Sequence, residues 1–275
     1  MRKREIEKEA PTRLHRIEPA AAEKLKTWFA GYVSRYKTGD KVRDHNILIK
    51  EQHTWNVCRE ICNLSEALDV DENGRILAEI TALFHDVGRF EQYTRYGTFL
   101  DRASVNHAGL GIEILKENRV LDDLDAHSRE FIYRVIEYHN TAFLPSDEDD
   151  LCLFFSRMLR DADKLDIWRV VTEYYHREEG EKNNAVELGL PDSPGVTPEA
   201  IGNLMERSIV MAEHIRNLND FKLLQMGWVF DVNFAHTRRE IKRRLYMERI
   251  LDVLPDSEAI RRIAGVIREE LNRRD

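Results

Sequence analysis

The stretch ALFHDVGRF, residues 82–90, places His85 beside Asp86 at the end of a run of small and apolar residues. Neighbouring side chains on a helix diverge by about 100°, so the two cannot comfortably bind one ion from the middle of a helix. At a helix end that is followed by Gly88, the backbone can turn and bring the two side chains together. The stretch therefore predicts a metal-binding corner at the end of a helix.

Outward from this corner, apolar residues recur with helical spacing along most of the chain, and glycine and proline are scarce. This pattern predicts an all-α fold. The predicted helices cover residues 18–36, 45–69, 74–87, 103–118, 127–139, 150–176, 198–217, 235–252 and 256–273. Residues 177–198 contain the glycine, proline and polar residues that are typical of a connection.

This connection suggests how the chain is organised, because 275 residues can form one large core or two modest ones. The predicted units are an N-terminal helical lead-in at 1–44, a metal-binding core at 45–176, a loop-rich connection at 177–197, and a C-terminal helical appendage packed on the core at 198–275. No motif assigns a role to the appendage.

The composition excludes several classes of protein. A net charge of −8 argues against a general nucleic-acid binder. No apolar run approaches the roughly 18 residues that span a bilayer, and the N-terminus MRKREIEKEAP lacks the apolar stretch of a secretory signal. Three cysteines do not indicate a disulfide framework. We therefore expect a cytoplasmic protein without membrane association or stable nucleic-acid binding, and the oligomeric state is left open.

Two of the cysteines have a second interpretation. Cys58 and Cys62 lie one helical turn apart and could bind a metal ion. Two small residues on a packed helix face explain the same spacing, and this is the simpler interpretation.

Five polar side chains fall on apolar helix faces: His53, His85, His107, His139 and Asp163. One such histidine is usually a hydrogen-bonded core residue, but five inward polar groups need a common partner. A buried carboxylate is costly unless it is paired or binds a cation, and divalent metals take imidazole and carboxylate ligands. The other histidines have polar or terminal surroundings and are expected to be structural or exposed: His15, His45, His127, His176, His214 and His236.

The order of these residues resembles the HD-domain superfamily of metal-dependent phosphohydrolases, over roughly residues 45–175. HDVGR, residues 85–89, resembles the central motif of the family, and RDADKLD, residues 160–166, resembles its last motif, in which Asp163 is the ligand. The resemblance implies an HD-domain helical bundle with a C-terminal helical extension. It also implies one or two divalent metal ions per chain, with Fe, Mn, Zn, Ni and Mg as candidates.

His107 and His139 resemble additional ligands of the HD proteins that hold two metals. That subset includes cyclic-dinucleotide phosphodiesterases, a diadenosine tetraphosphate hydrolase and a few di-iron oxygenases. By this resemblance, the first metal would be bound by His53, His85, Asp86 and Asp163. The second metal would be bound by His107 and His139 and would share Asp86 as a bridge.

The chain also departs from several relatives. Two kinds of HD enzyme, those that resemble the deoxynucleotide 5′-nucleotidases and those that resemble the guanosine tetraphosphate hydrolases, differ from this chain near the HD motif. They carry an acidic residue three positions after the HD aspartate, where this chain has Arg89. The GYP signature of the cyclic-dinucleotide enzymes is absent, and RYGTF, residues 95–99, does not replace it. The resemblance therefore leaves the specificity unassigned.

Two metals about 3.5–4 Å apart can present a bridging hydroxide in line to a phosphorus atom. Arg89 is our first candidate to bind the phosphoryl oxygens and stabilise their charge, and Lys164 is the second. For both, an ordinary surface ion pair is the alternative. Asp166 lies one turn from Asp163 and could orient a ligand or a water. Residues 89–104 form a polar and aromatic connection that either shapes a substrate pocket or is a plain surface loop.

Three functions remain open from the sequence. The first is hydrolysis of a phosphoester or phosphoanhydride bond in a small nucleotide-like substrate by a metal-bound hydroxide. The second is a di-iron oxygenase that uses the same ligands, and the third is a catalytically silent nucleotide-sensing module. The third is disfavoured because no ligand position is lost.

Overall fold

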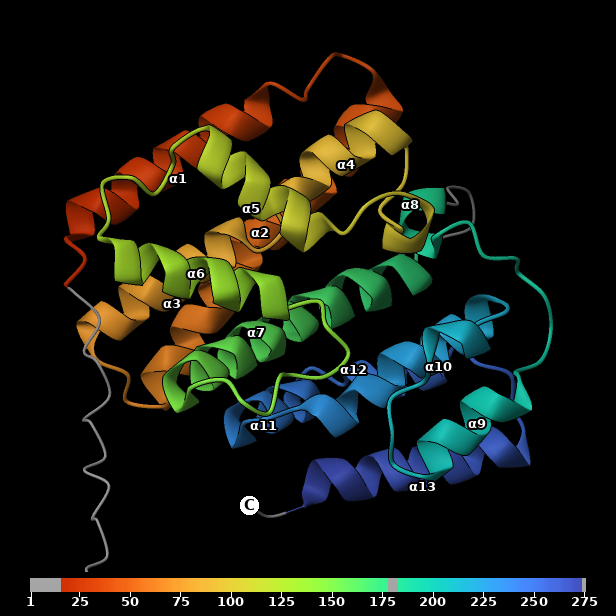
Figure 1. Ribbon diagram of the computed structural model, residues 1–275. Helices are drawn as coiled ribbons and strands as arrows, with labels where there is room; N and C mark the ends of the chain where they lie inside the picture. The colour runs from red at the N-terminus through yellow and green to blue at the C-terminus, as the bar shows by residue number, and fades with distance from the viewer. Residues whose placement is uncertain (1–15, 178–182, 274–275) are drawn as a thin grey trace, which may run out of the picture.

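The computed structural model describes residues 16–177 and 183–273, and within these ranges it is helical with no strand, which confirms the all-α prediction (Figure 1). The α-helices in chain order are α1 (Pro19–Ser34), α2 (Lys41–Ala67), α3 (Glu72–Phe84), α4 (Gly88–Tyr96), α5 (His107–Glu117), α6 (Ala126–Tyr138), α7 (Asp150–Tyr175), α8 (Asn184–Glu187), α9 (Pro198–Met205), α10 (Leu218–Gly227), α11 (Ala235–Arg243), α12 (Tyr246–Leu251) and α13 (Glu258–Asn272). None of the described helices is long and apolar enough to cross a membrane.

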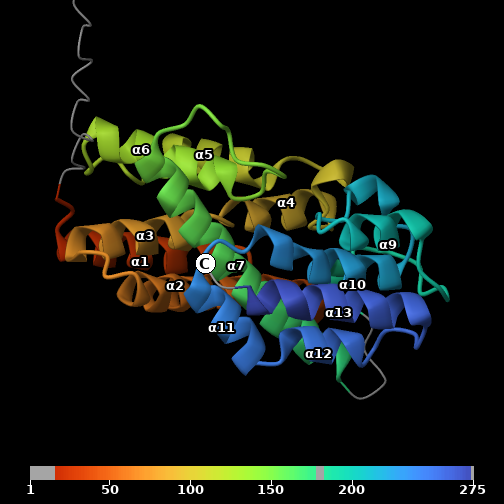
Figure 2. The ribbon, with the colours of Figure 1, turned by 90° about the horizontal axis from the view of Figure 1, so that it is seen from below.

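Helix α7 runs through the middle of the molecule, with α1–α6 on one side and α9–α13 on the other (Figures 1 and 2). Two clusters of buried apolar side chains meet along it. The first contains α7 residues up to Ala162, together with Phe29 and Val33 of α1. The second begins at Leu165 and Trp168 of α7 and continues into the C-terminal helices. Helix α7 therefore supplies side chains to both halves.

Polar contacts also fasten the C-terminal half to the first. The carboxylate of buried Asp161 on α7 accepts hydrogen bonds from the backbone N–H groups of Asn233 and Phe234, each at 3.1 Å. Arg244 forms a two-pronged ion pair with Glu60 of α2, at 2.7 and 2.8 Å. A buried charge is costly when it lacks a partner, so the loss of either partner in such a contact is destabilising. These contacts fix the position of the segment around residue 231, which becomes important below.

The structure corrects the prediction for residues 89–104. Their first part is helix α4, and Gly97, in the left-handed conformation at a φ of 67°, ends it. The prediction was wrong because one of the buried residues on α4 is polar: Gln92 is fully buried beside Phe90. The amide nitrogen of Gln92 donates hydrogen bonds to Asp101, to Ser104 and to a backbone carbonyl. These bonds allow the polar side chain to be buried.

The helix predicted over 198–217 ends at Met205, and α10 follows separately. The cause is buried Asp220, whose carboxylate accepts hydrogen bonds from the backbone N–H groups of Thr197 and Arg216 and holds the intervening chain folded back. The helix predicted over 235–252 is divided at Leu245, which has a φ of 56°.

Gly88 lets α4 approach α5 closely. A Cβ atom placed on Gly88 would lie 2.2 Å from the carbonyl oxygen of His107 and 2.7 Å from the backbone nitrogen of Gly111. Gly88 is not in a left-handed conformation, so the turn does not need the conformational freedom of glycine as the sequence suggested. The His85–Val87 turn instead needs the small size of Gly88, because any side chain there would push His107 away.

We predict that Gly88→Ala lowers the free energy of unfolding by about 1–3 kcal/mol, the usual range for an overpacked site. Urea denaturation followed by circular dichroism measures this change. The matched control is Gly265→Ala on α13, where a Cβ would have no neighbour within 4 Å; helix propensity makes that variant equal to or slightly more stable than the parent. Equal free energies of unfolding for the two variants would show that α4 and α5 can move apart to accommodate the methyl group without loss of stability.

Candidate metal centre

The structure brings together all six residues that the sequence proposed as ligands. They are His53, His85, Asp86, His107, His139 and Asp163, from α2, the α3–α4 turn, the start of α5, the end of α6, and α7. Five of them are at most 7% exposed. Asp163 is the most accessible, with 16% of its side chain exposed.

His53, His85 and Asp163 form a first trio, in which one potential ligand atom of each lies within 4.8 Å of the others. The distances from Asp163 Oδ1 to the Nε2 atoms of His53 and His85 are 3.0 and 3.7 Å. All three atoms are buried and have no hydrogen-bond partner within the described structure. Buried polar atoms are nearly always satisfied, so three such atoms facing one another fit a bound cation.

Asp86, His107 and His139 form a second trio. The Nε2 atoms of His107 and His139 are 2.9 Å apart, and Asp86 Oδ1 lies 3.3 and 3.9 Å from them. Burial lowers the pKa of His107 to about 4 and that of His139 to about 3. Both imidazoles are therefore neutral at neutral pH, which is the form that binds a metal.

The carboxylate of Asp86 faces both trios. Its Oδ2 atom lies 3.7 Å from Nε2 of both His53 and His85, while Oδ1 points toward His107. This arrangement suits a ligand shared between two ions. It also explains why His85 and Asp86 are adjacent in the sequence. The turn lets His85 join the first trio while the carboxylate of Asp86 lies between the histidines of both trios.

Two of the four histidines are oriented by backbone carbonyls. Nδ1 of His85 donates to the carbonyl of Ala82, and Nδ1 of His139 donates to the carbonyl of Ile136, each at 2.6 Å. In both cases the bond fixes the ring with Nε2 directed into the cluster. Metal-binding histidines commonly use their second nitrogen in this way.

The other two histidines are oriented by carboxylates. Nδ1 of His53 lies 2.8 Å from Asp166, and Nδ1 of His107 lies 2.7 Å from Asp101. Burial lowers the pKa of His53, but the neighbouring carboxylates of Asp163 and Asp166 outweigh it and raise the pKa to about 9. The sequence proposed Asp166 as a residue that could orient a ligand, and it did not single out Asp101.

The match to a known family agrees with this geometry. Residues 51–168 match the family model of the HD domain. The chain contains an HD domain. The matched region includes all six clustered residues and extends from α2 through most of α7. The search of curated proteins gave no match, and the search of solved structures gave none either.

Two cations lie against the shared carboxylate of the HD domain. Nζ of Lys50 is 2.8 Å from Asp86 Oδ2, and Nε of Arg89 is 3.4 Å from Asp86 Oδ1. Burial raises the pKa of Asp86, but Lys50 and its other cationic neighbours outweigh this and hold the pKa well below its usual range. Lys50 was not predicted, although its place three residues before His53 on the same helix face was a usable signal.

Arg89 and Lys164 lie at different distances from the cluster. The Nη1 atom of Arg89 donates to the side chains of Gln92 and Asp101, so this arginine also holds the carboxylate that orients His107. Lys164 points the other way, and its Nζ binds Asp231 at 2.6 Å. The assignment of either residue to substrate binding therefore stays a prediction.

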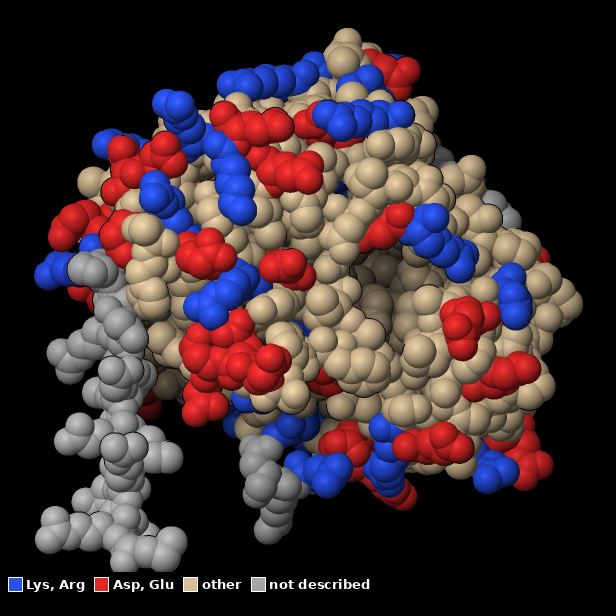
Figure 3. Space-filling model, viewed as in Figure 1, with Lys and Arg blue, Asp and Glu red and all other residues tan. Residues whose placement is uncertain are grey.

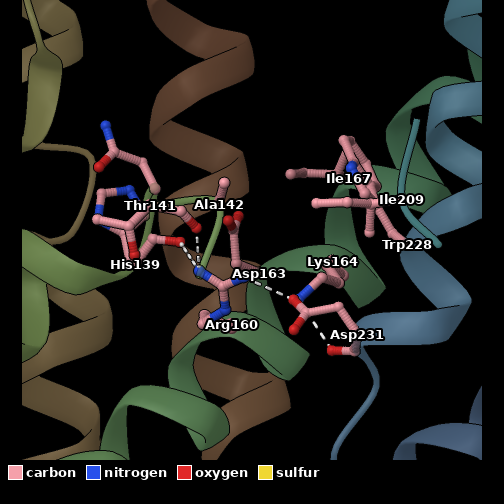
Figure 4. A pocket seen from close by; sticks show the side chains of 11 residues that line it. His139, Thr141, Ala142, Arg160, Asp163, Lys164, Ile167, Ile209, Trp228 and Asp231 are labelled. Carbon is pink, nitrogen blue, oxygen red and sulfur yellow. Dashed lines mark hydrogen bonds and ion pairs between the residues drawn. The ribbon is translucent and has the colours of Figure 1, made fainter. Parts of the chain in front are cut away.

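A cavity of about 230 Å³ opens beside the HD cluster, with His139 and Asp163 in its wall and Asp231 on the opposite side (Figure 4). In the space-filling view, the face of Figure 1 is hollowed over α7 (Figure 3). No group of potential ligands in the described chain includes Cys58 or Cys62. The six-residue cluster is thus adjacent to a cavity.

We predict that Asp86→Asn lowers the metal content per chain more than any single histidine substitution, because Asp86 faces both trios. His107→Ala and His139→Ala should each lose about one ion and keep the fold. Metal analysis of freshly purified protein measures these contents, with exposed His45→Ala and Asp252→Asn as controls. An unchanged metal content in Asp86→Asn would remove it as a shared ligand, and full content in both histidine variants would make His107 and His139 core residues.

Proposed function

We propose that this protein is a metal-dependent phosphohydrolase that cleaves a phosphoester or phosphoanhydride bond in a small, nucleotide-like substrate. The observation that carries the proposal is the pair of donor trios, of which Asp86 belongs to the second and also faces the first, beside an open cavity. The HD domain supports the same class, since this family consists generally of metal-dependent phosphohydrolases.

The donor set fits two divalent cations. His53, His85 and Asp163 would hold one ion, His107 and His139 would hold the other, and Asp86 would contact both. When bound, such ions polarise a phosphoryl oxygen and lower the pKa of water toward about 7. The protein itself keeps the imidazoles of His107 and His139 neutral by burial, and Asp166 and Asp101 fix the rings of His53 and His107.

Positive charge beside the cluster favours an anionic substrate. Lys50 and Arg89 both contact Asp86, and their side chains remain 19% and 15% exposed. Each is therefore placed to share its charge between Asp86 and a phosphoryl group. Asp163 is the ligand most open to the cavity, so the phosphate would enter on that side.

The two rival functions gain less from the structure. A di-iron oxygenase could use the same six side chains, but an uncharged substrate would have no need for Lys50 and Arg89. A silent sensing module would not require all six potential ligands to converge, as they do here. Hydrolysis is therefore the function that the charges and the cluster support together.

We expect phosphate release from a panel of phosphate esters and anhydrides to stop on chelation and to return when Mn, Fe, Zn, Ni or Mg is restored. The reaction should continue without oxygen, because water is the only co-reactant. Phosphate release measured aerobically and anaerobically on the metal-loaded protein tests this. An oxygen requirement would favour the oxygenase, and tight binding of phosphate compounds without turnover would favour the sensing module.

We further predict that Arg89→Lys keeps both metals but lowers kcat/KM by about 10- to 100-fold, the value of a hydrogen bond to a charged group, with Arg89→Ala lower still. A fall mainly in kcat indicates a contact made in the transition state, and a rise mainly in KM indicates ground-state binding. Exposed Arg261→Lys is the control. Near-normal turnover by metal-replete Arg89→Ala would remove Arg89 from the site.

A further inference from the structure

The cavity beside the metal cluster has two walls of different chemistry. His139 and Asp163 lie at one end, and Ile167, Ile209 and Trp228 form an apolar wall at the other (Figure 4). Ile209 and Trp228 belong to the C-terminal half, outside the matched HD domain. A substrate with its phosphate at the metals would therefore extend toward residues that only the C-terminal half supplies.

Asp231 provides the accessible polar group in this part of the cavity. Its Oδ2 atom accepts hydrogen bonds from Nη2 of Arg160 and from Nζ of Lys164, each at 2.6 Å. Its Oδ1 atom receives no hydrogen bond from the residues that the structure describes. The side chains of Arg160 and Lys164 are only 7% and 10% exposed, against 30% for Asp231. The two cations also line the cavity, but both are bound to Asp231, whose carboxylate is the most exposed of the three charged groups.

The two cations also keep Asp231 ionised. Burial raises the pKa of Asp231, but Lys164 and Arg160 outweigh it and the net shift is downward. The second nitrogen of Arg160 is bound to the backbone carbonyls of Tyr138, His139 and Thr141, so this guanidinium is not free to turn toward a ligand. An ionised carboxylate with an open oxygen accepts hydrogen bonds from hydroxyl or amino groups and repels a second anion.

We propose that Asp231 determines specificity by selecting substrates whose non-phosphate part is an uncharged, hydroxyl-bearing group with a flat apolar face, such as a nucleoside. The hydroxyls bind Oδ1 of Asp231, and the flat face lies on the side of Trp228 and Ile209. A second phosphate is rejected there. The inference rests on the proposed function, because the metal cluster has to hold the scissile phosphate.

The cavity volume agrees with this assignment. About 230 Å³ lies below the range of about 300–1,000 Å³ for sites that enclose drug-sized ligands, so it suits a small ligand. Sites that are built to hydrogen-bond a hydroxyl also discriminate strongly against analogues that lack it, because the buried acceptor is then left unpaired.

Two measurements on the metal-loaded protein test the proposal. Calorimetric titration compares adenosine with 2′,3′-dideoxyadenosine, which lacks the hydroxyls. Chromatography compares 5′-phosphate release from adenosine 5′-monophosphate and from adenosine 3′,5′-bisphosphate. We expect a preference of about tenfold or more for adenosine and for the monophosphate, of the order that hydroxyl recognition gives. In Asp231→Asn both preferences should fall to less than about threefold, with the metal content unchanged.

The control is Asp252→Asn, which removes an exposed carboxylate in the same half of the chain and should keep both preferences. If Asp231→Asn does not fold, Ile209→Trp narrows the cavity from its apolar wall and should abolish adenosine binding. Equal binding of both nucleosides, failure of both to bind, or a preference for the bisphosphate would overturn the proposal. Selective binding without any hydrolysis would instead overturn the proposed function and leave Asp231 as a determinant of ligand binding.

Discussion

The centre of this protein depends on one buried carboxylate. Asp86 is 3% exposed, yet its two oxygens lie within 4 Å of four imidazoles, a lysine and an arginine. A charge in such surroundings is stable only because its neighbours compensate it. The close contact at Gly88 and the short turn before it fix where Asp86 stands. The placement of α4 and α5 can therefore be understood as support for this single side chain.

The last motif of the HD domain has two separate tasks on the same helix. Asp163 and Asp166 face His53 in the candidate metal cluster. Asp161 and Lys164, on the opposite side, bind the backbone and side chains of residues 231–234. Because α7 is one continuous helix, the position of the candidate metal cluster is coupled to that of the C-terminal half. The same coupling places Asp231 at the cavity.

The sequence predicted which residues meet at the centre better than it predicted their surroundings. The four histidines and Asp163 were found because each interrupts an apolar helix face, which is a local pattern. Asp101 and Asp231 were not found, since only the folded chain brings each carboxylate against its partner, His107 for Asp101 and Lys164 for Asp231. Helix α4 was missed for a related reason: the burial of Gln92 depends on hydrogen bonds to Asp101 and Ser104 that no local pattern reveals.

The passage of α7 through both apolar clusters has a consequence for folding cooperativity. A fragment that ended after α7 would leave Leu165 and Trp168, both fully buried in the whole chain, without their packing partners. Full burial of such side chains contributes roughly 1.5–3 kcal/mol each, a large part of the stability of an ordinary domain. The two halves are therefore expected to unfold in a single transition. An HD domain cut out at the boundary of its sequence motifs would not be a smaller version of this protein.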